Sequence, residues 1–426
     1  MYADFGGGRS GQAPLTWGQR GIWDAMARNP PGHFNIGRVL MVPRRGGAEV
    51  AEVARAVGLL AKRHEALRTQ VALVEGEPRQ VVRASGRIPL TVVAADPADA
   101  AEAACGFLTR WTAEAFDHEV EWPLRVGVVS SGGRVRWMAL VLSHLAADGH
   151  ATEIVLRDLR LLLRQDAIGG PPPAQPLDLA REQHDAGARR TRAAIDFWTG
   201  QYERVAPVMF SPVHTGSGPR HRRVRLTSEP LAAAAGKVAD RHRVSSSTVL
   251  LAATAALVGA RTGHASVALS TIVGNRFSAG LRGMVTTLDQ LGLFVLDLAP
   301  GAGLDELVPR AWRAALAAYR HAYYDQPALD AALAAMGRRR GAELNPYCCF
   351  NDVRQPGGGS AVAPDASSRL DWLPDPDGIR CRFCLLVGDA PGAGLVLQLT
   401  ADTRCLTSDQ IARFLPELEN LVLSAV

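Results

Sequence analysis

The chain has 426 residues, of which 47% are hydrophobic and 21% are charged. This length is enough for two domains with sizeable cores, and the composition is that of an ordinary globular protein. The net charge of +5 comes almost entirely from arginine, because Lys62 and Lys237 are the only lysines. The arginines are scattered and no aromatic platform accompanies them, so the composition argues against nucleic acid as a partner.

The N-terminal segment is rich in glycine and contains Asp4 and Arg9. It lacks the apolar core of a signal peptide, and we expect it to be disordered. Further along, the longest apolar helical stretch, residues 249–260, is too short and too rich in alanine to span a bilayer. We therefore expect a cytoplasmic protein without a membrane partner.

Hydrophobic periodicity predicts that the first part of the chain contains both helices and strands. Helices are expected from Leu15 onward, over 50–68 and over 98–113, and strands over 34–42, 70–74, 79–82, 90–93 and 122–129. His64 falls within the second of these helices, among packing residues such as Val57 and Leu60. We therefore interpret His64 as a structural residue.

An apolar run, residues 138–142, has the length of a buried strand and forms a predicted hairpin with the strand before it. Ser143 and His144 end this strand, so a histidine is held at the end of a rigid element. Imidazole exchanges protons near neutrality, which makes a fixed histidine a candidate general base. A hydrogen-bonded structural role is the alternative for His144. Ser143 should point to the opposite face of the strand and is not expected to be its partner.

The residues after His144 predict a tight loop and then a helix. Asp148 and Gly149 form a predicted turn, Thr152 is a plausible N-cap, and residues 153–163 carry an apolar stripe that suits a helix lying on a sheet. The carboxylate of Asp148 thus follows the histidine by four residues, an arrangement that can hold an imidazole in one orientation.

A Gly-Gly-Pro-Pro-Pro run at residues 169–173 breaks regular structure and marks a linker, which we place at 169–185. The second part of the chain is expected to contain two helices within 231–258, a strand over 267–273 and the polar turn Gly274-Asn275-Arg276. This order of helix, strand and polar turn is similar to that of the first part. It favours a molecule made of two similar lobes.

The six cysteines lie in a chain too large to need disulfides. Cys381 and Cys384 have the spacing of a zinc-binding pair, with Cys348 and Cys349 as a possible second pair. However, residues 379–387 read as a strand, in which positions three apart face opposite sides, and adjacent cysteines do the same. We therefore expect no metal site and interpret the cysteines as small apolar residues in a reducing cytoplasm.

The heptapeptide Ser143-His144-Leu145-Ala146-Ala147-Asp148-Gly149 resembles the HHxxxDG motif of nonribosomal peptide synthetase condensation domains, which are related in fold to chloramphenicol acetyltransferase. Further stretches match this family in the right order and cover nearly the whole chain. They are residues 15–23, 63–69, 274–276, 290–295, 324–327, 345–351, 394–400 and 408–423.

The resemblance implies an α/β (α+β) fold of two chloramphenicol acetyltransferase-like lobes that form a V with a central tunnel. We place the first lobe at 1–168 and the second at 186–426, with a crossover segment near 355–385 that reaches back to the first lobe in the family. No adenylation or carrier segment is recognised, so we expect a stand-alone enzyme.

The resemblance also assigns roles to the motif residues. His144 would accept a proton from the attacking nucleophile or position it, and the backbone N–H of Gly149 would donate toward the developing oxyanion. Asp148 would pair with Arg276 as a structural bridge at the active site. Ser143 stands where the family has its first histidine, a position that supports the site.

Three further residues, Trp17, Tyr347 and Asn351, are candidate substrate-binding residues of the tunnel, with packing as the alternative role for each. The predicted reaction joins an acyl group, carried on the phosphopantetheine arm of an acyl or peptidyl carrier protein, to an amine or alcohol. The setting would be antibiotic or other secondary metabolism, with no bound cofactor. Two alternatives stay open: an acyl-CoA-dependent acyltransferase, and a non-catalytic docking module, which the serine at position 143 allows.

Overall fold

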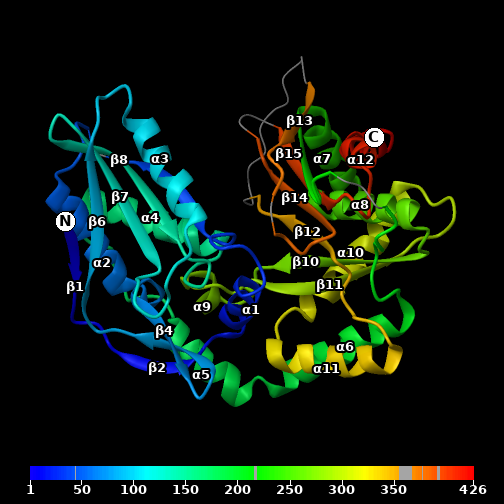
Figure 1. The fold of residues 1–426 in the computed structure, drawn as a ribbon, viewed down its shortest axis with the longest axis horizontal. Helices are drawn as coiled ribbons and strands as arrows, with labels where there is room; N and C mark the ends of the chain where they lie inside the picture. Colours follow the sequence, from blue (N-terminus) through cyan, green and yellow to red (C-terminus); the bar gives the residue numbers. More distant parts are fainter. Residues whose placement is uncertain (44, 215–217, 355–366, 377, 391–393) are drawn as a thin grey trace. The chain divides into compact units, whose positions relative to one another are not determined.

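A computed structural model describes residues 1–43, 45–214, 218–354, 367–376, 378–390 and 394–426 (Figure 1). The chain divides into two compact units. The first contains Met1–Ala188 and Gly274–Asp289, and the second contains Arg189–Val273 and Gln290–Val426. Both units combine helices with β-sheet, as predicted.

The first unit contains a five-stranded and a three-stranded sheet. The larger sheet has the strand order β1 (Tyr2–Phe5), β6 (Gly86–Ala94), β7 (Leu124–Ser131), β8 (Arg134–Leu142) and β3 (Ile36–Met41). The smaller sheet has the order β2 (Gly11–Pro14), β5 (Glu77–Val82) and β4 (Thr69–Val74). The helices are α1 (Trp17–Met26), α2 (Val50–Arg63), α3 (Ala100–Ala113), α4 (Gly149–Gln165), α5 (Pro176–Ala186) and α9 (Ala279–Arg282), and a 3-10 turn covers Glu65–Arg68.

Helices cover both faces of the larger sheet. Helices α2 and α4 bury Leu60 and Val155 in the same cluster as Leu140 of β8, whereas α3 packs on the opposite face of β7 and β8 (Figure 1). Strand β8 also lies between β7 and β3, with which it pairs antiparallel. Strand β8 is covered by helices on both faces and paired with a strand on each edge. It therefore holds the residues that follow its C-terminal end in a fixed position.

The N-terminal segment is ordered, so the expected disorder is wrong. Residues Tyr2–Phe5 pair antiparallel with β6, and Ala3 and Phe5 are buried while the residues beside them are exposed. This alternation has the period of two that anchors a strand on a core. Arg9 then forms ion pairs with Glu65 and Asp178. Two buried side chains and these ion pairs hold the segment despite its glycines.

The second unit contains one seven-stranded sheet. Its order is β11 (Gln290–Asp297), β10 (Ser266–Val273), β12 (Cys348–Asp352), β14 (Phe383–Asp389), β15 (Leu395–Asp402), β9 (His221–Ser228) and β13 (Ser368–Leu373). Its helices are α6 (Ala188–Arg204), α7 (Glu229–His242), α8 (Ser246–Thr262), α10 (Leu304–Arg320), α11 (Gln326–Arg340) and α12 (Ser408–Leu423).

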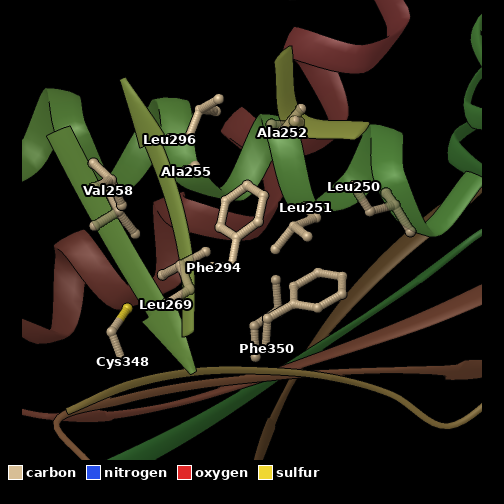
Figure 2. Close-up of a cluster of buried hydrophobic side chains, with 14 of the residues drawn as sticks. Leu250, Leu251, Ala252, Ala255, Val258, Leu269, Phe294, Leu296, Cys348 and Phe350 are labelled. Atoms are coloured by element: carbon tan, nitrogen blue, oxygen red, sulfur yellow. The ribbon is translucent and has the colours of Figure 1, made fainter. Parts of the chain in front are cut away.

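The core of the second unit lies between this sheet and the helices α7, α8, α10 and α12. Figure 2 shows Leu251 of α8 beside Phe294 of β11 and Phe350 of β12, and all three are buried. Cys348 points into the same cluster. Since side chains alternate along a strand, Cys349 and Asn351 lie on the sheet face opposite this core.

Two membrane-related observations concern the described part of the chain. No single helix there is long and apolar enough to cross a membrane. Helices α7 and α8 have the length and composition of a membrane span only when they are joined, and they are bent by 103° at their junction.

The unit boundaries differ from the expected lobes in two places. The expected linker, 169–185, includes most of α5, and this segment belongs to the first unit. Residues 274–289, expected in the second lobe, also belong to the first unit. Of the expected crossover near 355–385, residues 355–366 and 377 lie outside the described residues, and the described β13 pairs with β9 of its own unit.

The expected strand over residues 379–387 is observed only from Phe383. Cys381 therefore precedes β14, and its side chain is free of the alternation that we expected to separate it from Cys384. The two sulfur atoms are in contact. In contrast, Cys348 and Cys349 lie within β12, where alternation places their side chains on opposite faces as predicted.

Candidate functional site

His144 lies directly after β8 and its ring is held by Thr287. The Nδ1 atom is 3.1 Å from the Thr287 Oγ1 atom, and the same hydroxyl donates a hydrogen bond to the His144 backbone carbonyl. A hydroxyl has one proton, and a carbonyl oxygen can only accept. The Thr287 oxygen must therefore accept from Nδ1, so this geometry places the imidazole proton on Nδ1 and leaves Nε2 as the lone-pair nitrogen.

The surroundings of the His144 ring favour its neutral form. Burial lowers the pKa of His144, an effect opposed by a hydrogen bond with its own backbone carbonyl and by the negative charge of Asp148. Phe34 contacts the ring edge-to-face, with centroids 6.2 Å apart. Within the described residues, no hydrogen bond to Nε2 is found. A neutral imidazole in one tautomer, with an available Nε2, has the form of a general base.

Asp148 is the N-cap of α4, so the predicted N-cap at Thr152 is wrong. The Asp148 carboxylate accepts a hydrogen bond from the Ala151 N–H at 2.7 Å, and the helix begins at Gly149. Thr152 lies inside the first turn, and its hydroxyl donates to the Asp148 carbonyl. A short acidic side chain satisfies the free N–H groups of a first turn better than the more distant threonine does.

Asp148 and Arg276 form the predicted ion pair. One guanidinium nitrogen, Nη2, is 2.7 Å from both Asp148 carboxylate oxygens, and the Leu288 N–H donates to the same carboxylate at 3.0 Å. Arg276 also donates to the backbone carbonyls of Leu281, Met284 and Thr286. Asp148 is fully buried. The pair therefore fixes the segment 274–289 against the N-terminus of α4, within the first unit.

A second carboxyl, Asp289, belongs to the same charged cluster. Burial raises the pKa of Asp289 to about 8; the charge of Asp148 adds to this effect and that of Arg276 opposes it. One arginine cannot neutralise two carboxylates, and like charges in one site do not ionise together easily. A pKa of about 8 means that Asp289 is mostly protonated at neutral pH.

Gly149 is the first residue of α4, where backbone N–H groups lack partners within the helix. Among the described residues we find no acceptor for the Gly149 N–H, and a side chain added at this glycine would meet open space. The positive end of the helix dipole adds to the donor character of this group. The arrangement can stabilise a negative oxygen at this end of α4.

Ser143 is buried and supports the backbone of the motif. Its hydroxyl accepts a hydrogen bond from the Leu145 N–H at 3.2 Å and is 2.7 Å from the Nε2 atom of His118. Within the described residues, no hydrogen bond joins the side chains of Ser143 and His144. Ser143 thus links His118 to the backbone of the loop after β8.

Helix α1 packs under the same loop. The Gln19 side chain donates to the Leu145 carbonyl at 3.4 Å, and Gly18 approaches the Thr287 carbonyl so closely that a Cβ would clash with it. Trp17, a candidate substrate-binding residue, is buried with its ring against Gly187. This is the environment of a packing residue, and its role toward a substrate stays a prediction.

The other two candidate substrate-binding residues belong to the second unit. The Tyr347 hydroxyl donates to Glu343 at 2.6 Å, and the Arg382 guanidinium lies 4.4 Å from the ring centroid. Burial, together with the contact to Glu343, raises the pKa of Tyr347 to about 12. Asn351 is half-buried on β12. The first unit brings together His144, Asp148, Gly149, Arg276 and Ser143, whereas Tyr347 and Asn351 are not part of that cluster.

Three residues of the site were not predicted from the sequence. Thr287 and Asp289 come from a segment more than 130 positions after the motif, and His118 lies in the loop before β7. Each acts through a contact distant in sequence, and none belongs to a stretch that resembles a family motif. We also find no cluster of three or more His, Cys, Asp or Glu side chains in the described residues with the geometry to hold a metal ion.

Comparison with known proteins identifies the family of the chain. The family model described as "Condensation domain" matches residues 9–351. Phosphinothricin tripeptide synthetase PhsB of Streptomyces viridochromogenes is 28% identical over 322 residues, which are 71% of this chain and 26% of PhsB. The match thus spans about a quarter of the length of this relative.

Solved structures show the same fold. The condensation domain that mediates chain release from the enacyloxin polyketide synthase has a TM-score of 0.76 at 18% identity, over 96% of this chain and 81% of that one. The X-domain from teicoplanin biosynthesis, solved in complex with OxyB, has a TM-score of 0.72 at 18% identity, over 99% and 94% of the two chains. The predicted class, two chloramphenicol acetyltransferase-like lobes, is confirmed by these similarities. The chain belongs to the condensation-domain family of nonribosomal peptide synthesis.

Proposed function

We propose that this chain transfers an acyl group from a thioester to an amine or alcohol, with the thioester carried on the phosphopantetheine arm of a carrier protein. Condensation domains form amide or ester bonds and work with carrier-protein domains. The single observation that carries the proposal for this chain is the His144 ring, whose Nδ1 atom is held by the Thr287 hydroxyl at 3.1 Å. No bound cofactor takes part in the proposed reaction.

In the proposed reaction, the Nε2 atom of His144 accepts the proton of the nucleophile as its nitrogen or oxygen attacks the thioester carbonyl. The Gly149 N–H donates to the oxyanion that forms. Collapse of this intermediate breaks the carbon–sulfur bond, and the imidazolium returns its proton to the leaving thiolate. The Asp148–Arg276 pair holds the helix N-terminus in place throughout.

The identity of the acyl donor distinguishes the proposed reaction from that of an acyl-CoA-dependent acyltransferase. The test is mass spectrometry of products from a panel of acyl-carrier and acyl-CoA thioesters, each offered a pooled set of amines and alcohols. We expect a product with acyl-carrier donors that is lost in His144→Ala and kept in His184→Ala, because His184 is exposed on α5. Turnover with acyl-CoA alone would select the CoA-dependent alternative.

A docking role is the second candidate, and two observations favour keeping it. Ser143 replaces a motif histidine, and the X-domain, a structural relative of this chain, was solved in complex with OxyB. No product from any donor, with His144→Ala folded and carrier binding retained, would favour docking over catalysis. That the chain acts as a stand-alone enzyme stays a prediction.

A further inference from the structure

Four cysteines of the second unit lie on or directly before two neighbouring strands, β12 and β14. Cys349 and Cys384 are register partners in this parallel pair. Cys348 and Phe383, one position earlier on each strand, are buried in the core. Alternation along the strands therefore places Cys349 and Cys384 together on the opposite face, where both are half-buried.

Cys381 joins this pair because β14 starts only at Phe383. The Cys384 thiol donates to the Cys381 sulfur at a distance of 2.7 Å. This separation is only about 0.7 Å longer than a disulfide bond of roughly 2.05 Å. The Cys381 sulfur is also 2.9 Å from the Phe383 carbonyl oxygen, which fixes it over the start of the strand. Both residues are half-buried.

The electrostatics of the group are those of interacting thiols. A hydrogen bond from Cys384 lowers the pKa of Cys349. Hydrogen bonds with Cys349 and Cys381, followed by burial, raise the pKa of Cys384 well above its ordinary value. Cys384 is thus the central residue of a three-sulfur contact. The four cysteines all belong to the described residues, and they do not form a cluster with the geometry of a metal site.

We propose that Cys381 and Cys384 are a modification site, at which a peroxide oxidises the two thiols to a reversible intramolecular disulfide. One thiolate attacks a peroxide oxygen, which breaks the oxygen–oxygen bond and gives a sulfenic acid and hydroxide. The second thiol then attacks the sulfenic sulfur, which breaks the sulfur–oxygen bond. The released hydroxides take up the two thiol protons. With hydrogen peroxide the products are one disulfide and two water molecules.

The test uses the full chain, reduced and then treated with hydrogen peroxide. We expect the number of titratable thiols to fall from six to four, with an intact mass lower by two hydrogen atoms, and dithiothreitol to restore both values. Trypsin cleaves after Arg380 and Arg382, so Cys381 and Cys384 fall on separate peptides. A disulfide would keep the dipeptide 381–382 attached to the peptide 383–404.

The variants Cys381→Ser and Cys384→Ser should each lose this linked species, whereas Cys349→Ser should keep it. Circular dichroism of each variant controls for folding. A linked species that contains Cys349 in place of Cys381 would overturn the assignment. So would an irreversible gain of oxygen mass, a disulfide between two chains, or six thiols retained after peroxide treatment. None of these outcomes depends on the acyl-transfer proposal.

Discussion

At the scale of single residues, the proposed chemistry depends on one threonine hydroxyl. Thr287 accepts from the His144 ring and donates to the His144 backbone, so it fixes both the tautomer and the ring orientation. A histidine without this partner could rotate or place its proton on Nε2. Thr287 is therefore a positioning residue, one that acts on the substrate through His144.

We expect Thr287→Val to lower kcat by about 10–100-fold, since a hydrogen bond that orients a reacting group is worth roughly 1–3 kcal/mol. Thr287→Ser should recover most of the activity because it keeps the hydroxyl. The measurement is kcat and KM for both variants across pH. A loss in the serine variant equal to that in the valine variant would contradict the role of the hydroxyl.

The half-buried carboxyl of Asp289 gives a pH dependence that can be predicted in sign. Its pKa is about 8 in the folded chain, against about 4 for an unfolded aspartate. Between these values the folded state binds a proton that the unfolded state has lost, so this group makes the chain less stable as pH rises from 4 to 8.

Asp289→Asn should remove this contribution. The difference in melting temperature between the variant and the wild type should be larger at pH 8 than at pH 5, by about 1 °C for each kcal/mol regained in a chain of this length. Asp185→Asn, an exposed aspartate on α5, is the matched control and should show no such difference. A gain for Asp289→Asn that is the same at both pH values would contradict the raised pKa.

At the scale of elements, the N-terminus of α4 is held by a segment that is distant in sequence. Asp148 caps the helix and at the same time binds Arg276 and the Leu288 N–H. A buried ion pair is costly to break from one side, because the remaining charge has neither water nor a partner. The two sides of this pair should nevertheless respond differently to substitution.

Arg276→Met should destabilise the chain by about 3–5 kcal/mol, because it leaves a buried carboxylate unpaired. Asp148→Asn should cost less, since asparagine is a good N-cap and Arg276 keeps three backbone carbonyls. Denaturant unfolding of the single and double variants measures the coupling. If the losses in unfolding free energy of the two single variants add up to the loss in the double variant, the two residues are not coupled.

At the scale of the whole molecule, each unit has its own core. The cluster around Leu140 belongs to the first unit and the cluster around Phe294 belongs to the second. Units with separate cores can open separately, and amide hydrogen exchange reports such local opening. The chain nevertheless leaves the second unit after β10, supplies residues 274–289 to the first, and returns at β11.

Phe294→Ala should cost about 3–5 kcal/mol through the cavity that it leaves. The loss of amide protection should be concentrated in β10, β11 and β12, while β7 and β8 keep theirs. Leu140→Ala is the reciprocal variant and should affect β7 and β3 instead. Equal loss of protection in both units for either variant would mean that the two cores unfold as one.

The sequence alone determined the parts of this protein that depend on local patterns. Alternation and helical periodicity predicted β7, β8, α7 and α8, and the order of short motifs predicted the family. These signals are local because hydrophobic periods and motif spacings lie within a few residues of one another. The pair of Asp148 with Arg276 joins distant positions and was expected only because the family resemblance implied it.

Only the tertiary structure decided the contacts between distant segments. It placed Thr287 on His144 and His118 on Ser143, ordered the glycine-rich N-terminus by pairing it with β6, and assigned residues 274–289 to the first unit. It also brought Cys381 to Cys384, because β14 begins later than alternation suggested. In each case the deciding interaction joins positions whose neighbours in sequence carry no sign of the partner, so no local pattern could have predicted it.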